Sequence, residues 1–131
     1  MKEETRSFET HWALRNWVLI LSAAMSEKEM KEAVAGLDNV KGGRTVSYEF
    51  VNPCWLHGQL FNRPGFADNS SVLTSRLSRI EMIDNTVYAI TKSGSCYRLE
   101  DGIDGIGIRE GEDDITVEAT TAPGEVARYK L

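Results

Sequence analysis

The chain has 131 residues, of which 41% are hydrophobic and 27% are charged. This balance is typical of one globular domain and excludes a disordered chain or a coiled coil. With 15 basic and 20 acidic residues the formal net charge is −5, so we do not expect direct DNA binding through general charge attraction. The longest apolar run, residues 17–21, is too short for a membrane span.

The first seven residues are polar, and we expect this segment, 1–7, to be frayed. It carries two early acidic residues and leads into no apolar stretch, which is untypical of a secretory signal. The expected location is therefore the cytoplasm, where Cys54 and Cys96 would be free, buried thiols. His57 follows Cys54 by three residues, and on a strand that offset places the two side chains on opposite faces. The spacing argues against a catalytic Cys–His pair.

Residues 12–21 form the first predicted element, and two interpretations stay open. As a helix, the apolar side chains of this segment form one stripe. As a strand, the segment is a buried run with aromatic and β-branched residues, which is the interpretation we favour.

A helix is predicted over residues 26–37. Ser26 and Glu29 have the spacing of a capping box, in which each side chain accepts a hydrogen bond from the other residue's backbone N–H. Apolar residues follow at helical spacing, and they are Met30, Ala33, Val34 and Leu37. Gly36 and the pair 38–39 are typical stop signals.

Strands dominate the rest of the chain. Residues 45–50 alternate between polar and apolar and predict a half-buried strand. Residues 54–61 predict another, in which Gly58 marks a bulge or a close backbone approach. After a loop at 62–69, residues 72–83, 86–91 and 96–99 predict a three-stranded meander. Residues 100–114 are expected to be an acidic, glycine-rich loop, and 115–117 a short edge strand. The expected fold is one α+β domain over 1–131, mainly an antiparallel sheet or small open barrel with one packed helix.

The acidic residues are concentrated near the C-terminus. Residues 98–131 carry four basic and nine acidic side chains, a difference equal to the charge of the whole chain. This segment is either a solvated loop or an acidic face that meets a basic partner. The candidate partner-binding residues are Glu110, Glu112, Asp113 and Asp114.

The candidate ligand-binding residues lie at the start of the meander. On a regular strand, Thr74 and Arg76 share one face and would present a hydroxyl and a guanidinium to a phosphate or carboxylate. Arg79 would join them only if a bulge or the strand edge brought it round. The alternative is an ordinary solvent-facing side of the strand.

No catalytic, cofactor or metal motif is complete in this sequence. A dinucleotide fingerprint starting at Gly105 would need glycine where Glu110 stands, and calcium-loop spacing from Asp101 fails at Ile103. There is no G-x-S-x-G sequence around a serine. We therefore predict a protein that is not an enzyme and needs no cofactor or metal.

Five short motifs follow one another in a recognisable order. They are WVL at 17–19, LHGQL at 56–60, PGFAD at 64–68, TSRLSRI at 74–80 and SGSCYRL at 93–99. In this order they resemble small β-rich proteins of phages and prophages, most of which have no assigned function. The resemblance covers about residues 14–99, with the helix at 26–37 as an insertion.

The resemblance implies a phage origin and a role against host defence, and it transfers no catalytic residues. The expected function is a non-enzymatic inhibitor that binds a bacterial immune component, either a protein effector or a nucleotide signal. The alternative is a homo-oligomeric phage accessory or assembly module with no ligand. A small hydrolase or transferase is a third possibility, which the sequence supports least.

Overall fold

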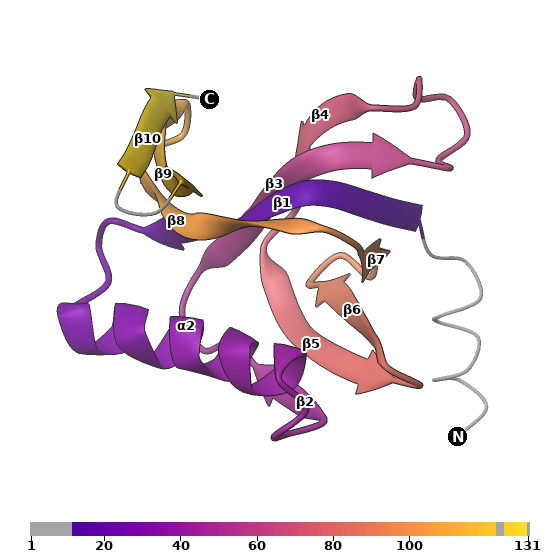
Figure 1. Cartoon of the computed structure of the whole chain (residues 1–131), viewed down its shortest axis with the longest axis horizontal. Coiled ribbons are helices and arrows are strands. Elements are labelled where there is room, and N and C mark those ends of the chain that lie inside the picture. The colour runs from indigo at the N-terminus through magenta and orange to yellow at the C-terminus, as the bar shows by residue number, and fades with distance from the viewer. Residues whose placement is uncertain (1–11, 123–124, 131) are drawn as a thin grey trace.

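The computed structural model describes residues 12–122 and 125–130, so the predicted frayed segment 1–7 lies outside it. The described chain contains one helix and a ten-stranded, strongly curled sheet that forms an open half-barrel (Figure 1). The elements in chain order are β1 (Trp12–Ser22), α2 (Glu27–Lys41), β2 (Ser47–Glu49), β3 (Cys54–Phe61), β4 (Ser70–Leu73), β5 (Leu77–Ile83), β6 (Thr86–Thr91), β7 (Cys96–Leu99), β8 (Gly102–Gly111), β9 (Asp114–Ala122) and β10 (Glu125–Lys130). The expected α+β class is confirmed.

β1 is the central strand of the sheet. One of its edges pairs antiparallel with β3, and the other pairs parallel with β7 and then, further along, with β8. The sheet is therefore mixed, and the expected antiparallel character holds only for most of the pairs. The parallel pairs arise because the chain leaves β7, passes two residues and continues as β8 along the same edge of β1. The segment 12–21, left open between helix and strand, is a strand.

The predicted helix is present and its capping box is formed. Ser26 Oγ accepts a hydrogen bond from the backbone N–H of Glu29 at 3.1 Å, and Glu29 Oε1 accepts one from the N–H of Ser26 at 2.7 Å. The predicted end is wrong, because α2 continues through Gly36 to Lys41. Gly36 is buried inside the helix against the ring of Tyr48 on β2. The glycine therefore permits a close contact between helix and strand and is no stop signal.

The meander of β5, β6 and β7 is confirmed, but its first strand is shorter than predicted. Residues 72–83 do not form one strand, since β4 ends at Leu73 and β5 begins at Leu77. The chain changes neighbours in this interval, because β4 pairs with β3 whereas β5 pairs with β6 and β2. Thr74 stabilises the chain where the partner strand changes, through hydrogen bonds to the backbone. Its Oγ1 accepts one from the N–H of Leu56 at 3.0 Å.

The predicted loop at 100–114 is wrong, because most of it is the hairpin of β8 and β9. The glycines that suggested a loop serve packing instead. A Cβ at Gly102 would lie 2.9 Å from the indole of Trp17, and one at Gly107 would collide with the side chain of Ile20. Small residues are needed here because β8 lies directly against large side chains of β1.

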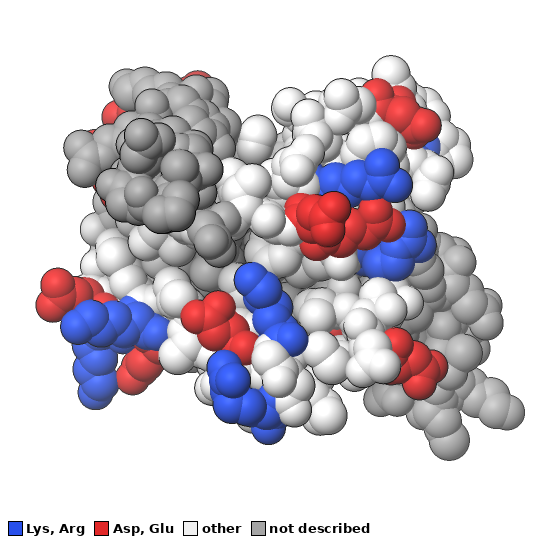
Figure 2. All heavy atoms as spheres, in the orientation of Figure 1, with Lys and Arg blue, Asp and Glu red and all other residues white. Residues whose placement is uncertain are grey.

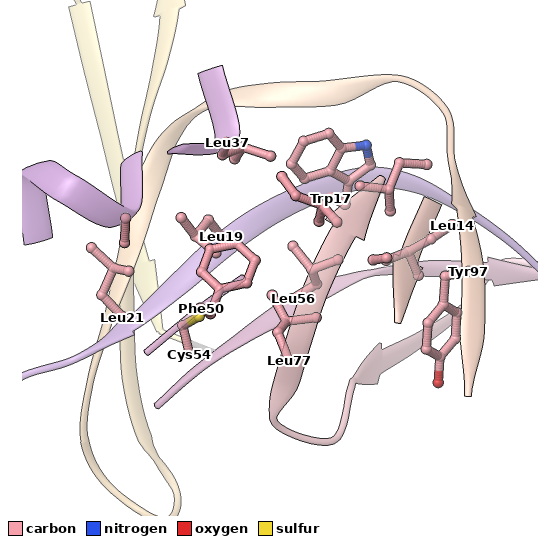
Figure 3. Close-up of a cluster of buried hydrophobic side chains, with 14 of the residues drawn as sticks. Leu14, Trp17, Leu19, Leu21, Leu37, Phe50, Cys54, Leu56, Leu77 and Tyr97 are labelled. Atoms are coloured by element: carbon pink, nitrogen blue, oxygen red, sulfur yellow. The ribbon is translucent and has the colours of Figure 1, made fainter. Parts of the chain in front are cut away.

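Two clusters of buried side chains lie on opposite faces of β1. The larger one fills the space between the sheet and α2, where Leu37 lies beside Trp17 and Leu19 (Figure 3). The smaller one joins Val18 and Ile20 to side chains of β9. Both cysteines are free and buried, as predicted. Within the described residues, no helix has the length and apolar character that a membrane span requires.

Candidate functional site

The strands beside β1 lose their regular register at one level of the sheet. The pairing of β1 with β3 shifts between Arg15 and Val18, and the pairing with β8 shifts between Trp17 and Leu19. Asn16, inside the first shift, has a positive φ of 51°. Bulges of this kind are common beside binding and catalytic sites because they re-aim side chains.

Gly58 of β3 makes room for the bulge in β1. A Cβ at this position would lie 3.0 Å from the carbonyl oxygen of Arg15 and 3.1 Å from the Cα of Trp17. Both contacts are with the backbone of β1, which cannot move aside as a flexible side chain can. The predicted close backbone approach at Gly58 is confirmed, and its partner is the bulge.

A cavity of about 200 Å³ opens at this bulge. We call it the bulge pocket. Its side chains come from four strands, β1, β3, β4 and β8, and they divide into polar and apolar groups. The lining residues are Asn16, Val18, His57, Gly58, Gln59, Ser71 and Ile103.

The polar side chains that the structure describes in the bulge pocket carry no formal charge. Asn16 Nδ2 donates a short hydrogen bond to Gln59 Oε1, which orients both amides. Burial lowers the pKa of His57 below its usual 6.5, so the imidazole is neutral at pH 7 and carries one donor and one acceptor nitrogen. Among the described side chains, no buried nitrogen or oxygen lacks a hydrogen-bond partner, and Ser71 is exposed. The polar atoms of His57 and Ser71 that make no contact within the protein therefore face solvent, from which a ligand can reach them.

The charged groups beside the pocket are paired with one another. Arg15 Nε lies 2.6 Å from Glu100 Oε1, and the Arg15 guanidinium stacks 4.3 Å over the ring of Phe61. Glu100 Oε2 lies 2.6 Å from Arg98 Nη2. Hydrogen bonds from Arg15, and then from Arg98, hold the pKa of Glu100 below its usual value. Figure 2 shows acidic atoms flanked by basic atoms on this face, over the ends of β1 and β7.

The three predicted ligand residues are not brought together. Thr74 is buried, and its hydroxyl accepts from the N–H of Leu56 and donates to the carbonyl oxygen of Ser75. Arg76 is exposed, so the shared exposed face expected for it and Thr74 does not form. Arg79 pairs with Glu81. The cause is the break between β4 and β5, and a role of these residues in ligand binding stays a prediction.

The four predicted partner-binding residues do lie together, at the turn between β8 and β9. Three of them are exposed and the fourth is half-buried at the start of β9. We call this group the acidic tip, and it consists of Glu110, Glu112, Asp113 and Asp114. Arg109 braces the turn, because its guanidinium donates to the carbonyl oxygens of Gly111 and Glu112 and stacks 4.5 Å over Trp55.

A second cavity, of about 260 Å³, lies between α2 and β8. Apolar side chains make most of its wall, including Trp17, Leu37 and Ile106. Its charged side chains are Asp38 and Lys41, and the Lys41 ammonium already stacks 5.2 Å from the Trp17 ring. The polar side chains of this cavity are charged, whereas those described in the bulge pocket are uncharged.

The sequence interpretation did not identify the residues of the bulge pocket. Gly58 was the one signal that pointed toward it, since a glycine inside a strand marks a bulge or a close approach. No group of three or more His, Cys, Asp or Glu residues that could hold a metal ion occurs in the described part of the chain.

Comparison of the chain with models of known protein families, with curated proteins and with solved structures finds no match.

Proposed function

We propose that this chain is a non-enzymatic binding protein that takes up a small molecule in the bulge pocket. The resemblance to phage and prophage proteins suggests the identity of the small molecule, a nucleotide signal of bacterial immunity. The protein would inhibit the immune response by sequestering this signal. The observation that carries the proposal is that the polar side chains of His57 and Ser71 line one cavity at the bulge, with no buried polar atom of the described side chains left unsatisfied, and so are open to solvent.

The state of the cysteines argues against catalysis by a cysteine nucleophile. Burial raises the pKa of Cys54 to about 12 and that of Cys96 to about 11. Both side chains are therefore protonated thiols at pH 7, and a thiol is a poor nucleophile compared with a thiolate. His57 lies on the face of β3 opposite to Cys54 and cannot serve as its base.

Thermal unfolding with a panel of linear and cyclic nucleotides tests the proposal. A nucleotide that binds only the folded state raises the melting temperature. Ser71→Trp, on the exposed edge strand β4, places an indole over the pocket and should abolish that rise. Ser47→Trp is the matched control, because Ser47 is also exposed but lies on β2, at another edge of the sheet. The absence of a rise with every nucleotide would contradict the proposal.

A second candidate function is binding of a basic protein effector by the acidic tip. It is favoured by the gathering of Glu110, Glu112 and Asp113 as exposed residues around one hairpin turn. Charge reversal of these three residues to lysine should weaken binding to a purified effector, and salt should weaken it too. Glu49→Lys, on exposed β2, is the control. Unchanged binding by the triple variant would rule out the tip.

A further inference from the structure

We infer that the bulge pocket recognises the uncharged ring of its ligand, a nucleobase, and leaves any phosphate outside. This rests on the proposed function, uptake of a small molecule in that pocket.

The polar groups that line the bulge pocket match those of a nucleobase. Asn16 and Gln59 supply amides, Ser71 a hydroxyl and His57 an imidazole, so the pocket offers donors and acceptors without formal charge. The edges of nucleobases carry the same kinds of groups, namely ring nitrogens, amino groups and carbonyl oxygens. A phosphate is instead recognised by arginine, lysine or a run of backbone N–H groups.

The volume of the bulge pocket suits a single ring system. The cavity holds about 200 Å³, below the roughly 300–1,000 Å³ of pockets that enclose a whole drug-sized ligand. It has room for one ring system and not for a complete nucleotide. Val18 and Ile103 supply apolar surface for the faces of a ring, and Gly58 adds no side chain between them. Enzymes that hold single bases in pockets also combine apolar contacts on the ring faces with polar contacts at the ring edge.

The positions of the cations disfavour a phosphate inside the pocket. No arginine or lysine is among the residues described as lining it. Arg15, next to Asn16 in the chain, lies outside the lining and pairs through Nε with Glu100, which also pairs with Arg98. A phosphate in the pocket would therefore meet no cation of the described lining, whereas an uncharged ring needs none.

Isothermal titration separates recognition of the ring from recognition of the phosphate. The probes are the four ribonucleosides, their 5′-monophosphates and inorganic phosphate, each at about 0.05 M and about 0.5 M NaCl. We expect at least one nucleoside to bind within about threefold of its monophosphate, with little effect of salt, because no charge contact is involved. Inorganic phosphate should not compete.

Variants of the pocket locate the binding. Removing a hydrogen bond to the ring should weaken nucleoside binding by up to about tenfold. His57→Phe keeps a ring of similar size without its polar atoms. Ser71→Ala tests the same point at an exposed position on the edge strand β4. Lys92→Ala, exposed in the turn after β6 and outside the pocket, should leave nucleoside binding unchanged.

Failure of ring recognition and failure of the proposed function give different experimental results. Monophosphates that bind far more tightly than nucleosides, and weaken steeply with salt, would overturn ring recognition while uptake of a small molecule stood. Nucleoside binding that Ser71→Ala and His57→Phe both leave unchanged would overturn the pocket as its location. No binding of any nucleoside or nucleotide would overturn the proposed function, and this inference with it.

Discussion

The indole Nε1 of Trp17 donates a hydrogen bond to the carbonyl oxygen of Glu100, 2.8 Å away. The contact lies where the parallel neighbour of β1 changes from β7 to β8. The backbone N–H of Glu100 in turn donates to the carbonyl oxygen of Leu14 at 2.9 Å. Glu100, the first of the two residues between these strands, is thus held by β1 through both its backbone N–H and its carbonyl oxygen, and this fixes the start of β8 beside the bulge pocket.

Trp17→Phe should lower the free energy of unfolding by about 1–3 kcal/mol, because it removes the donor and leaves a partly buried carbonyl oxygen without that partner. Urea unfolding followed by circular dichroism measures the loss. Trp55→Phe is the control, since Trp55 is half-buried and its ring stacks with the Arg109 guanidinium. An equal loss in both variants would mean that ring volume, and not the hydrogen bond, sets the effect.

Stability should fall in acid partly through Glu100. Its pKa is lower in the folded protein than in the unfolded chain, chiefly because Arg15 and then Arg98 donate hydrogen bonds to it. This contribution is present above the unfolded value of about 4.3 and is lost as pH falls through the lower folded value. Because Arg15 is half-exposed, each pair contributes less than about 1 kcal/mol.

Glu100→Gln should therefore flatten the dependence of unfolding free energy on pH below about 4.3. Denaturant midpoints measured from neutral to acidic pH give the comparison. Glu112→Gln is the matched control, because Glu112 is an exposed acid whose contact with Arg109 runs through its backbone carbonyl. If both variants keep the wild-type slope, the two arginines do not stabilise the ionised form of Glu100.

Local signals predicted the elements whose cause is local. The capping box of Ser26 and Glu29 and the turn at 84–85 each depend on neighbours in the chain. Asp84 and Asn85 both have positive φ, 51° and 67°, as a two-residue hairpin turn requires. The hairpin of β8 and β9 was missed because its glycines match side chains of β1, about 85 residues earlier in the chain.

Gly58→Ala should destabilise the protein by about 1–3 kcal/mol, because the new methyl group would press on the backbone of Arg15 and Trp17 at 3.0 and 3.1 Å. It should also disturb the bulge pocket, so nucleoside binding should fall with it. Gly111→Ala is the control, since a Cβ there meets its nearest atom, of Asp114, at 4.0 Å. Equal unfolding midpoints for the two variants would show that β1 can relax away from β3.

The bulge pocket itself was beyond sequence reasoning for a physical reason. Asn16 and His57 lie on β1 and β3, Ser71 on the edge strand β4 and Ile103 on β8, and only the sheet order brings them together. The shared strand face predicted for Thr74 and Arg76 does not form, for the converse reason. That prediction assumed one regular strand, and the change of partners between β4 and β5 turned the first side chain inward.

Gly36→Ala sets helix propensity against packing. In an exposed helix this substitution stabilises by about 0.5–1 kcal/mol, because alanine loses less backbone entropy than glycine. Here the added Cβ would lie 2.5 Å from three ring atoms of Tyr48, so we expect a net loss of about 1–3 kcal/mol. Thermal and urea unfolding give the sign.

A smaller side chain at position 48 should reverse that sign. In a Tyr48→Leu background the ring is gone, and Gly36→Ala should become neutral or stabilising, as helix propensity alone predicts. The two single variants and the double variant form a cycle whose coupling energy isolates the contact between α2 and β2. A coupling near zero would mean that α2 is not held against β2 through Gly36, and that another contact orients the helix on the sheet.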